Sequence, residues 1–157
     1  MKKRIIVKRP MQSAELIETE IKYRCALKEY ISNDRRALLE PVSFLGLGNL
    51  VAIVDEDRIA KNLDMNVFIF TNSSVYPIQL LCGNVVFCRL VLNDNASYDY
   101  KVESLTDTDI QLINNLLNEY MQITIGKSFN QMYSSLKKYK RPVVSAFEGG
   151  EQINEND

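Results

Sequence analysis

Apolar and β-branched residues gather in short runs along the first ninety positions, with polar turns between them. The first run covers residues 3–9 and is followed by Pro10. Four later runs have similar composition: residues 37–45, 49–54, 66–70 and 85–92. Runs of this length and composition are typical of strands. Gly83 and Asn84 divide the last run from a short apolar piece before it, for which a turn of helix or an extended segment are both open.

Apolar positions spaced three and four residues apart predict three helices, over residues 22–32, 106–121 and 128–139. The second has the strongest start signal. Thr106 can accept a hydrogen bond from the Asp109 N–H as an N-cap, and the acids of the first turn suit the positive end of the helix dipole. We therefore expect this helix to pack its apolar face on a core.

Two segments near the predicted strands leave alternatives open. Residues 14–21 fit the start of a helix capped by Ser13, and equally a second strand that pairs with the first in a hairpin. Pro41 interrupts the run 37–45 and cannot donate to a ladder, so an edge position or a bulge is expected there.

These elements together predict an α+β fold, with a small antiparallel or mixed sheet packed against two or three helices. We expect an α+β domain over residues 1–124, an appended helix over 125–141 and a disordered acidic tail over 142–157.

Composition fits a folded protein and offers no membrane span. The chain has 157 residues, 46% of them apolar and 25% charged, and no apolar run approaches the length of a membrane helix. The apolar run after the basic N-terminus is too short for a signal peptide, so we expect a cytoplasmic protein. Cys25, Cys82 and Cys88 lack metal-site spacing and are expected to be buried thiols. On one extended strand Cys82 and Cys88 would point to the same face, too far apart to bond each other.

The absence of histidine narrows the chemistry further. Without imidazole, the chain cannot form a Ser–His–Asp or Cys–His arrangement or a histidine-bearing zinc site. Enzymes that use carboxylates, lysine, tyrosine or an oxygen-bound metal remain open, and would need acids that converge in a deep pocket. We expect no enzyme activity and no cofactor.

Two stretches resemble ligand sites but lack the required residues. Gly46 and Gly48 precede a strand-like run, and neither a third glycine nor a lysine follows at the spacing of a dinucleotide or Walker loop. A turn with positive φ at one of them is expected. The acids at 55–57 are adjacent, so their side chains cannot all converge on a metal ion. A solvated hairpin turn is expected there.

Charge clusters raise a second class of function. The net charge is −1, but residues 1–9 contain five basic residues and no acid, and a second basic cluster covers 137–141. The simpler interpretation is that these basic side chains are solvated, at the ends of a strand and of a helix. The functional alternative is nucleic-acid contact through this set: Lys137, Lys138, Lys140 and Arg141.

The segment order resembles a known family. "GNLVAIVDED", then "LDMNV", then an apolar segment with a glycine and "VVF", then "SLTDTDIQLINNLL" resemble the domain of unknown function thirty-eight forty-six, over roughly residues 3 to 120. These are small proteins of phages, plasmids and other mobile elements of Gram-positive bacteria. The matching positions are Asn66, Gly83, Val85, Val86, Thr106, Asp109 and Ile110. The chain departs from the pattern at "NDRR", where a glycine pair is usual, and in its longer C-terminal part.

The resemblance implies no catalytic residue, and it favours the hairpin interpretation of the first segments. It also implies a context in which small proteins often bind host proteins, including defence nucleases. We therefore expect a non-enzymatic protein-interaction module of a phage or mobile element, and one role that this context implies is inhibition of a host defence system such as a CRISPR nuclease. The expected contact residues are Tyr76, Tyr98, Tyr100, Phe129, Met132 and Tyr133.

Overall fold

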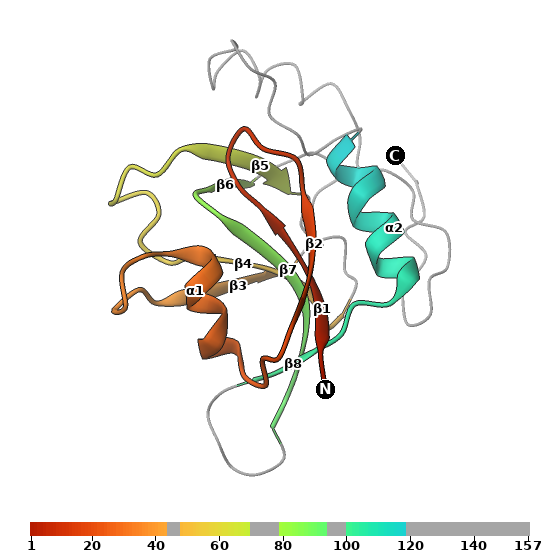
Figure 1. Cartoon of the computed structure of the whole chain (residues 1–157). Coiled ribbons are helices and arrows are strands. Elements are labelled where there is room, and N and C mark those ends of the chain that lie inside the picture. The colour runs from red at the N-terminus through yellow and green to blue at the C-terminus, as the bar shows by residue number, and fades with distance from the viewer. Residues whose placement is uncertain (44–47, 70–78, 94–99, 119–157) are drawn as a thin grey trace.

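The computed structural model describes residues 1–43, 48–69, 79–93 and 100–118, and these form a sheet-dominated fold (Figure 1). The strands are β1 (Lys3–Lys8), β2 (Glu15–Thr19), β3 (Leu39–Ser43), β4 (Leu50–Asp55), β5 (Met65–Ile69), β6 (Gln79–Cys82), β7 (Val85–Val91) and β8 (Lys101–Glu103). The helical elements are the 3-10 turn η1 (Arg24–Leu27), α1 (Lys28–Ile31) and α2 (Asp107–Leu116). The antiparallel sheet of the predicted α+β fold is confirmed, while the helical part of the described chain is smaller than that class implies.

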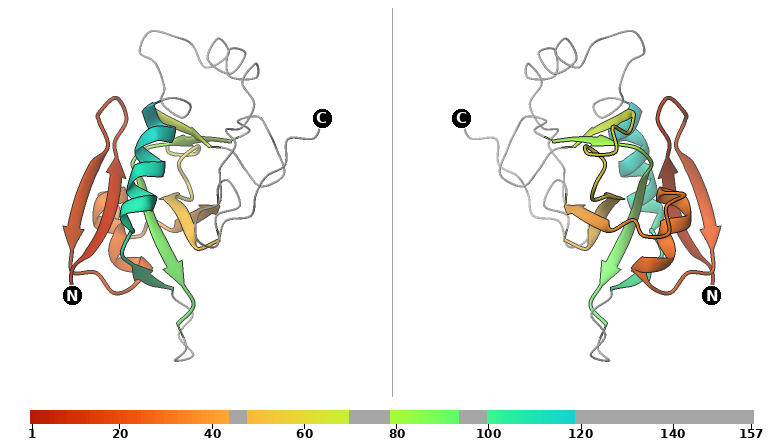
Figure 2. Two further views of the ribbon diagram at one scale, coloured as in Figure 1. Left: turned by 90° about the vertical axis from the view of Figure 1, so that its right-hand side faces the viewer. Right: turned by 90° about the vertical axis from the view of Figure 1, so that its left-hand side faces the viewer.

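The main sheet runs in the order β2-β1-β7-β4-β3, and β8 pairs with β7 beyond the end of β1. Every ladder in it is antiparallel. A smaller antiparallel pair, β5–β6, lies beside it. β2 and β3 are therefore the two outer strands, and Figure 2 shows the β1–β2 hairpin standing at one side of the molecule.

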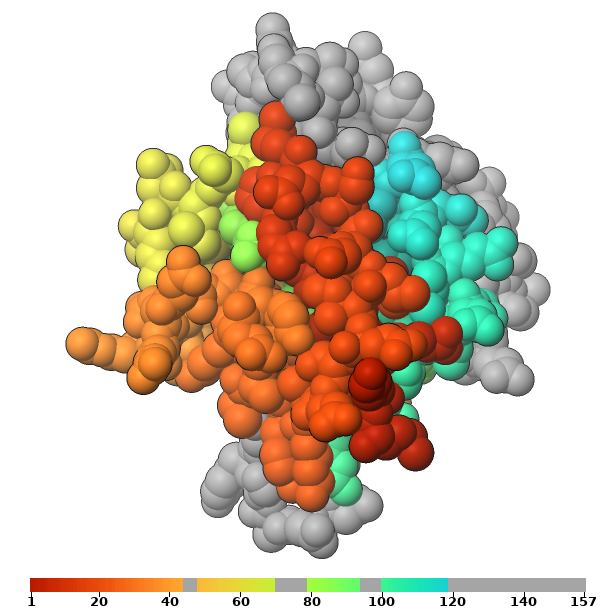
Figure 3. Space-filling model, in the orientation of Figure 1, coloured from red at the N-terminus to blue at the C-terminus, as the bar shows by residue number. Residues whose placement is uncertain are grey.

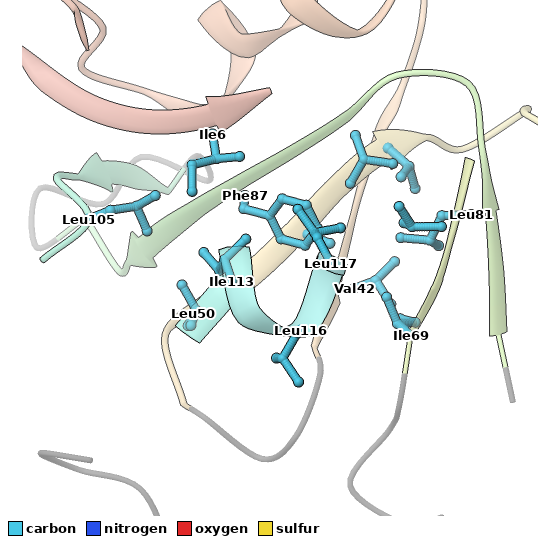
Figure 4. Close-up of a cluster of buried hydrophobic side chains, with 14 residues drawn as sticks. Ile6, Val42, Leu50, Ile69, Leu81, Phe87, Leu105, Ile113, Leu116 and Leu117 are labelled. Carbon is cyan, nitrogen blue, oxygen red and sulfur yellow. The ribbon is translucent and has the colours of Figure 1, made fainter. Parts of the chain in front are cut away.

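Successive side chains of each strand point to opposite faces of the sheet, and each face carries its own core. One cluster, which we call the α2 core, contains Ile6, Phe87 and the apolar side of α2, with Ile113 and Leu117 close to Phe87 (Figure 4). The other, the α1 core, contains Ile5 and the buried side chains of η1 and α1. Alternation along β1 therefore assigns each face of the hairpin to one core.

The hairpin interpretation of residues 14–21 is correct, and the helical alternative is not. A tight turn joins the two strands, with the Gln12 N–H donating to the Arg9 C=O at 3.2 Å. Pro10 fits the second position of this turn, and Met11 at the third has a φ of 61°. Side chains other than glycine adopt that conformation at a cost, and Met11 is exposed there.

The predicted helix over 22–32 is wrong in extent. Val102 donates to the Lys22 C=O and Arg24 donates to the Tyr100 C=O, both at 2.9 Å, so residues 22 and 23 run extended beside β8 up to the start of η1. Only Arg24–Ile31 is helical, as η1 and α1. The pairing beside β8 uses backbone groups that a helix would need for its own hydrogen bonds. The helical part therefore begins at Arg24 and not at residue 22.

Candidate functional site

The acids after β4 form a closed turn and no metal site. Asp55 is buried, and its carboxylate accepts hydrogen bonds from the Asp57 N–H at 2.9 Å and from Lys61 Nζ at 2.7 Å. Glu56 and Asp57 are exposed. The lysine lies between carboxylates, and its hydrogen bond to Asp55 raises its pKa. Within the described residues no three acidic or thiol side chains could share a metal ion. The predicted turn is confirmed, but Asp55 is buried and not solvated, and β4 pairs with β3 and β7 and not with the next strand, so the turn does not close a hairpin.

Asn66 is buried and joins three parts of the fold. Its Nδ2 donates to the Lys8 C=O and to the Gly83 C=O, both at 2.7 Å, and its Oδ1 accepts from Lys8 Nζ at 3.0 Å. Gly83 has a φ of 75°, and a Cβ there would lie 2.7 Å from Leu63 Cδ1. Burial lowers the pKa of Lys8. These contacts connect the end of β1 to the β6–β7 turn. Asn66 and Gly83 therefore have an architectural role.

The start of α2 is also architectural. Thr106 Oγ1 accepts from the Asp109 N–H at 3.1 Å, and the Asp109 carboxylate accepts from the Thr106 N–H at 2.9 Å, so the capping box is complete. Arg89 on β7 binds the same carboxylate through two hydrogen bonds of 2.7 Å. Burial alone raises the pKa of Asp109, but the bonds from Arg89 and Thr106 outweigh it and hold that pKa below its usual range. The N-cap prediction is confirmed.

An open polar groove of about 550 Å³ lies beside the hairpin. Its walls include Arg9, Glu29, Asp34 and Asp64. Asp34 is already engaged, because the Arg36 N–H donates to it at 2.9 Å and Lys61 Nζ lies 3.5 Å from it. The backbone N–H of Arg36 lowers the pKa of Asp34. The groove therefore presents mixed charges without a convergent catalytic set among the described residues.

The outer edge of β2 is one of the two edges of the main sheet that no described strand pairs with. Arg4 of β1 directs its N–H to Ser104 Oγ and its C=O to the Leu105 N–H, both at 3.0 Å and both away from β2. Glu18 lies opposite Arg4 in the ladder. Since antiparallel pairs alternate between bonded and non-bonded, Glu18 and Leu16 turn their own N–H and C=O groups outward. No described strand pairs with that edge.

The side chains of β2 alternate between the two faces. Leu16 lies opposite Ile6 and shares the α2 face with Glu18, while Ile17 lies opposite Ile5 on the α1 face, together with Glu15. Each face of the outer strand thus carries one aliphatic group and one carboxylate. Leu16 keeps 49% of its surface exposed although it is in the middle of a strand. The hairpin lies at the surface of the face seen in Figure 3.

The opposite edge, β3, is closed by its sequence. The Glu56 N–H donates to the Leu38 C=O at 2.9 Å, and the β3–β4 register continues from that pair. Alternation then places Pro41 with its nitrogen toward the outer edge, where an N–H is missing. Glu40 of this strand forms an ion pair with the buried Arg58. The edge position expected for Pro41 is confirmed.

Most residues that the sequence proposed as contacts lie outside the described part of the chain. They are Tyr76, Tyr98, Phe129, Met132 and Tyr133, and the basic residues Lys137, Lys138, Lys140 and Arg141. Tyr100 is described: it packs against the α1 core, and the Arg24 guanidinium carbon lies 5.4 Å from its ring centre. Of the proposed contact residues only Tyr100 lies within the described chain, and the expected contact patch stays a prediction.

Of the three cysteines, Cys82 and Cys88 are buried as predicted, and Cys25 is exposed, which corrects the expectation for that residue. The turn at Gly83 places Cys82 on β6 and Cys88 on β7, which agrees with the division of this apolar segment expected at Gly83 and Asn84. Burial raises the pKa of Cys88 to about 12, so its thiol is unreactive near neutral pH.

Comparison with known proteins yields no match to a family model, a curated protein or a solved structure. The family resemblance of the sequence therefore stays a prediction. Among the described helices, none has the length and apolar character needed to cross a bilayer.

Sequence reasoning did not single out the edge of β2, although the signals are present. Residues 12–20 contain Glu15, Glu18 and Glu20 and neither a basic residue nor a proline. Strand order cannot be read from one sequence, so nothing showed that this strand would be outermost. Even with the hairpin known, residues 15–19 could equally have formed a central strand of the sheet.

Proposed function

We propose that this protein is a non-enzymatic interaction module that binds an extended segment of a partner protein along the outer edge of β2. A strand added there would bond to the outward N–H and C=O groups of Leu16 and Glu18 and extend the sheet by one strand. The single observation that carries the proposal is that this edge is unpaired among the described strands and contains no proline, while the other edge contains Pro41.

Edge strands usually carry devices that prevent unwanted pairing. β3 contains Pro41, and its Glu40 forms an ion pair with the buried Arg58. β2 has neither feature and forms a regular five-residue ladder with β1. An unprotected edge with an exposed leucine is the more suitable of the two for binding another chain. In the context that the family resemblance implies, the partner is a host or element-encoded protein, such as a component of a host defence system.

The experiment removes one outward N–H and leaves the ladder with β1 intact. Tagged wild-type protein and Leu16→Pro are incubated with a bacterial lysate, and bound proteins are quantified by mass spectrometry. Leu16→Ala controls for loss of the side chain, and Ser43→Pro makes the same backbone change on the opposite edge, where Ser43 also faces outward by the same alternation.

The proposal requires a protein that the wild type, Leu16→Ala and Ser43→Pro all retain and Leu16→Pro loses. Circular dichroism and thermal unfolding must show that Leu16→Pro is folded. If that folded variant retains the same bound proteins as the wild type, the edge of β2 is not the binding surface.

A further inference from the structure

We propose that the segment bound by β2 is basic, with the order basic–apolar–apolar–basic opposite residues 15–18. This inference rests on the proposed function and adds the chemistry of the partner. It follows from the alternation along the strand, from the charges of the hairpin and from the partners that the described carboxylates have or lack.

The order of side chains on the bound strand follows from β2. In antiparallel pairing, residues directly opposite each other lie on the same face and contact each other. Glu15 and Glu18 would each face one basic side chain of the partner, and Leu16 and Ile17 would each face one apolar side chain. The motif reads the same in both directions, so the basic residues keep their positions whichever way the segment runs.

The Glu18 carboxylate has no ion-pair partner among the described residues. Arg4 lies opposite it in the ladder, yet the Arg4 guanidinium turns to Asp107, with 2.6 Å between Nη1 and Oδ1. Glu18 forms no ion pair with any described residue and is exposed. A lysine or arginine on an added strand would supply the charge that Arg4 does not.

Glu15 is paired, but its pair is exposed and replaceable. Arg9 Nη1 lies 3.0 Å from Glu15 Oε2, and the two side chains are 35% and 59% exposed. Exposed pairs of this kind contribute little, because water screens them and ordering both side chains costs entropy. A basic residue of a partner can therefore compete with Arg9 for this carboxylate.

The same charges disfavour a second copy of this chain as the occupant. Residues 12–20 carry three carboxylates and no cation, so pairing two copies along β2 doubles the negative charge at one seam. A two-fold arrangement centred on Ile17 would also place Leu16 opposite the partner's Glu18, an apolar group against a charge. Like charges on adjacent strands are destabilising, whereas opposite charges add to the ladder. The edge thus selects for a basic segment and against itself.

The test measures fluorescence anisotropy of two labelled peptides with the full-length protein. One has Lys-Val-Val-Lys at its centre, and the other has Glu-Val-Val-Glu between the same flanking residues. The protein variants are Leu16→Pro, which removes the outward N–H, and the double variant Glu15→Gln/Glu18→Gln, which removes the charges. Glu56→Gln/Asp57→Asn is the matched control, with the same charge change at two exposed acids in the turn after β4, away from β2.

We expect the lysine peptide to bind the wild type and the glutamate peptide not to bind. The Glu15→Gln/Glu18→Gln change should weaken the lysine peptide about tenfold, and the control double change less than about twofold. Raising NaCl from about 0.05 M to about 0.5 M should weaken binding to the wild type more than to the Glu15→Gln/Glu18→Gln variant.

The remaining outcomes separate this inference from the proposed function. Equal binding of both peptides, lost in Leu16→Pro, keeps strand addition and overturns the basic partner. Binding of the lysine peptide that survives Leu16→Pro shows charge attraction alone and overturns both, as does no binding of either peptide at millimolar concentration. Concentration-dependent dimers in sedimentation, lost in Leu16→Pro, overturn this inference in favour of a second copy.

Discussion

The two outer strands of the main sheet have equal length and opposite character. β2 and β3 each have five residues and each pairs on one side only among the described strands. At β3 a proline faces outward and a glutamate binds a buried arginine. At β2 the outward backbone groups are intact, and one glutamate has no described partner. Two edges of one sheet therefore differ in the backbone groups that they would offer to an added strand.

The difference shows that charge alone does not close an edge. Both strands contain glutamate. Glu40 forms an ion pair with Arg58 of the same molecule, while Glu15 and Glu18 remain exposed at the surface. A carboxylate at an edge repels a like-charged strand and attracts an opposite one, whereas a missing N–H disfavours every strand. We regard β2 as selective and β3 as closed.

The largest expected effect tests which backbone groups of β2 face outward. Ile17→Pro removes an N–H that faces β1 and should lower the free energy of unfolding by about 3 kcal/mol or more. Leu16→Pro removes an outward N–H and should cost less than about 1 kcal/mol, because the preceding residue is already extended. Urea unfolding of both variants measures the difference. Equal losses would show that the assigned alternation is wrong.

A second prediction compares the glutamates of the two edges. Glu40→Gln leaves the buried Arg58 without its carboxylate and should cost about 1–2 kcal/mol, less than for a fully buried pair because Glu40 is partly exposed. Glu15→Gln breaks an exposed pair and should cost no more than about 0.5 kcal/mol. Denaturant unfolding at low and high salt measures both. A larger loss at Glu15 would contradict the contrast between the edges.

The third prediction opens the closed edge. Pro41→Thr restores an outward N–H on β3 with a residue that favours strands, and should change the free energy of unfolding by less than about 1 kcal/mol. The variant should self-associate at concentrations where the wild type does not, as sedimentation velocity would detect. A variant that stays as monomeric as the wild type would mean that Pro41 is not what protects this edge.

The smallest expected effect concerns the turn that sets the β1–β2 register. Met11→Gly relieves a positive φ and should raise the free energy of unfolding by about 0.5 kcal/mol, since the gain exceeds the entropy of the added glycine. Asn62→Gly is the control at a φ of 52°, where asparagine is tolerated and little change is expected. Differential scanning calorimetry compares the two. A destabilised Met11→Gly would show that the turn favours methionine.

Local signals in the sequence predicted local structure well. The capping box at Thr106, the edge position of Pro41, the turn after β4 and the break at Gly83 all depend on residues within a few positions of each other. Gly48 has the positive φ expected at one of the two glycines, with a value of 64°. Each of these features has a cause that acts through the neighbouring backbone.

Features that depend on distant pairing could not be predicted. The three-residue β8 is too short to show a period, and its pairing with residues 22–24 shortens the expected helix. Asn66 reads as an ordinary polar residue in a strand, and only the approach of Lys8 and Gly83 explains its burial. The candidate edge was missed for the same reason, since a strand becomes outermost only through the order of the whole sheet.

The spacing of the outward groups also limits how firmly the edge can hold another chain. Within β2 only Leu16 and Glu18 offer a donor and an acceptor each, and single hydrogen bonds contribute about 0.5–1.5 kcal/mol net. A complex held only by these few backbone hydrogen bonds dissociates quickly unless the two proteins also contact each other elsewhere. An edge of this kind suits a transient interaction, in which the partner binds and dissociates repeatedly.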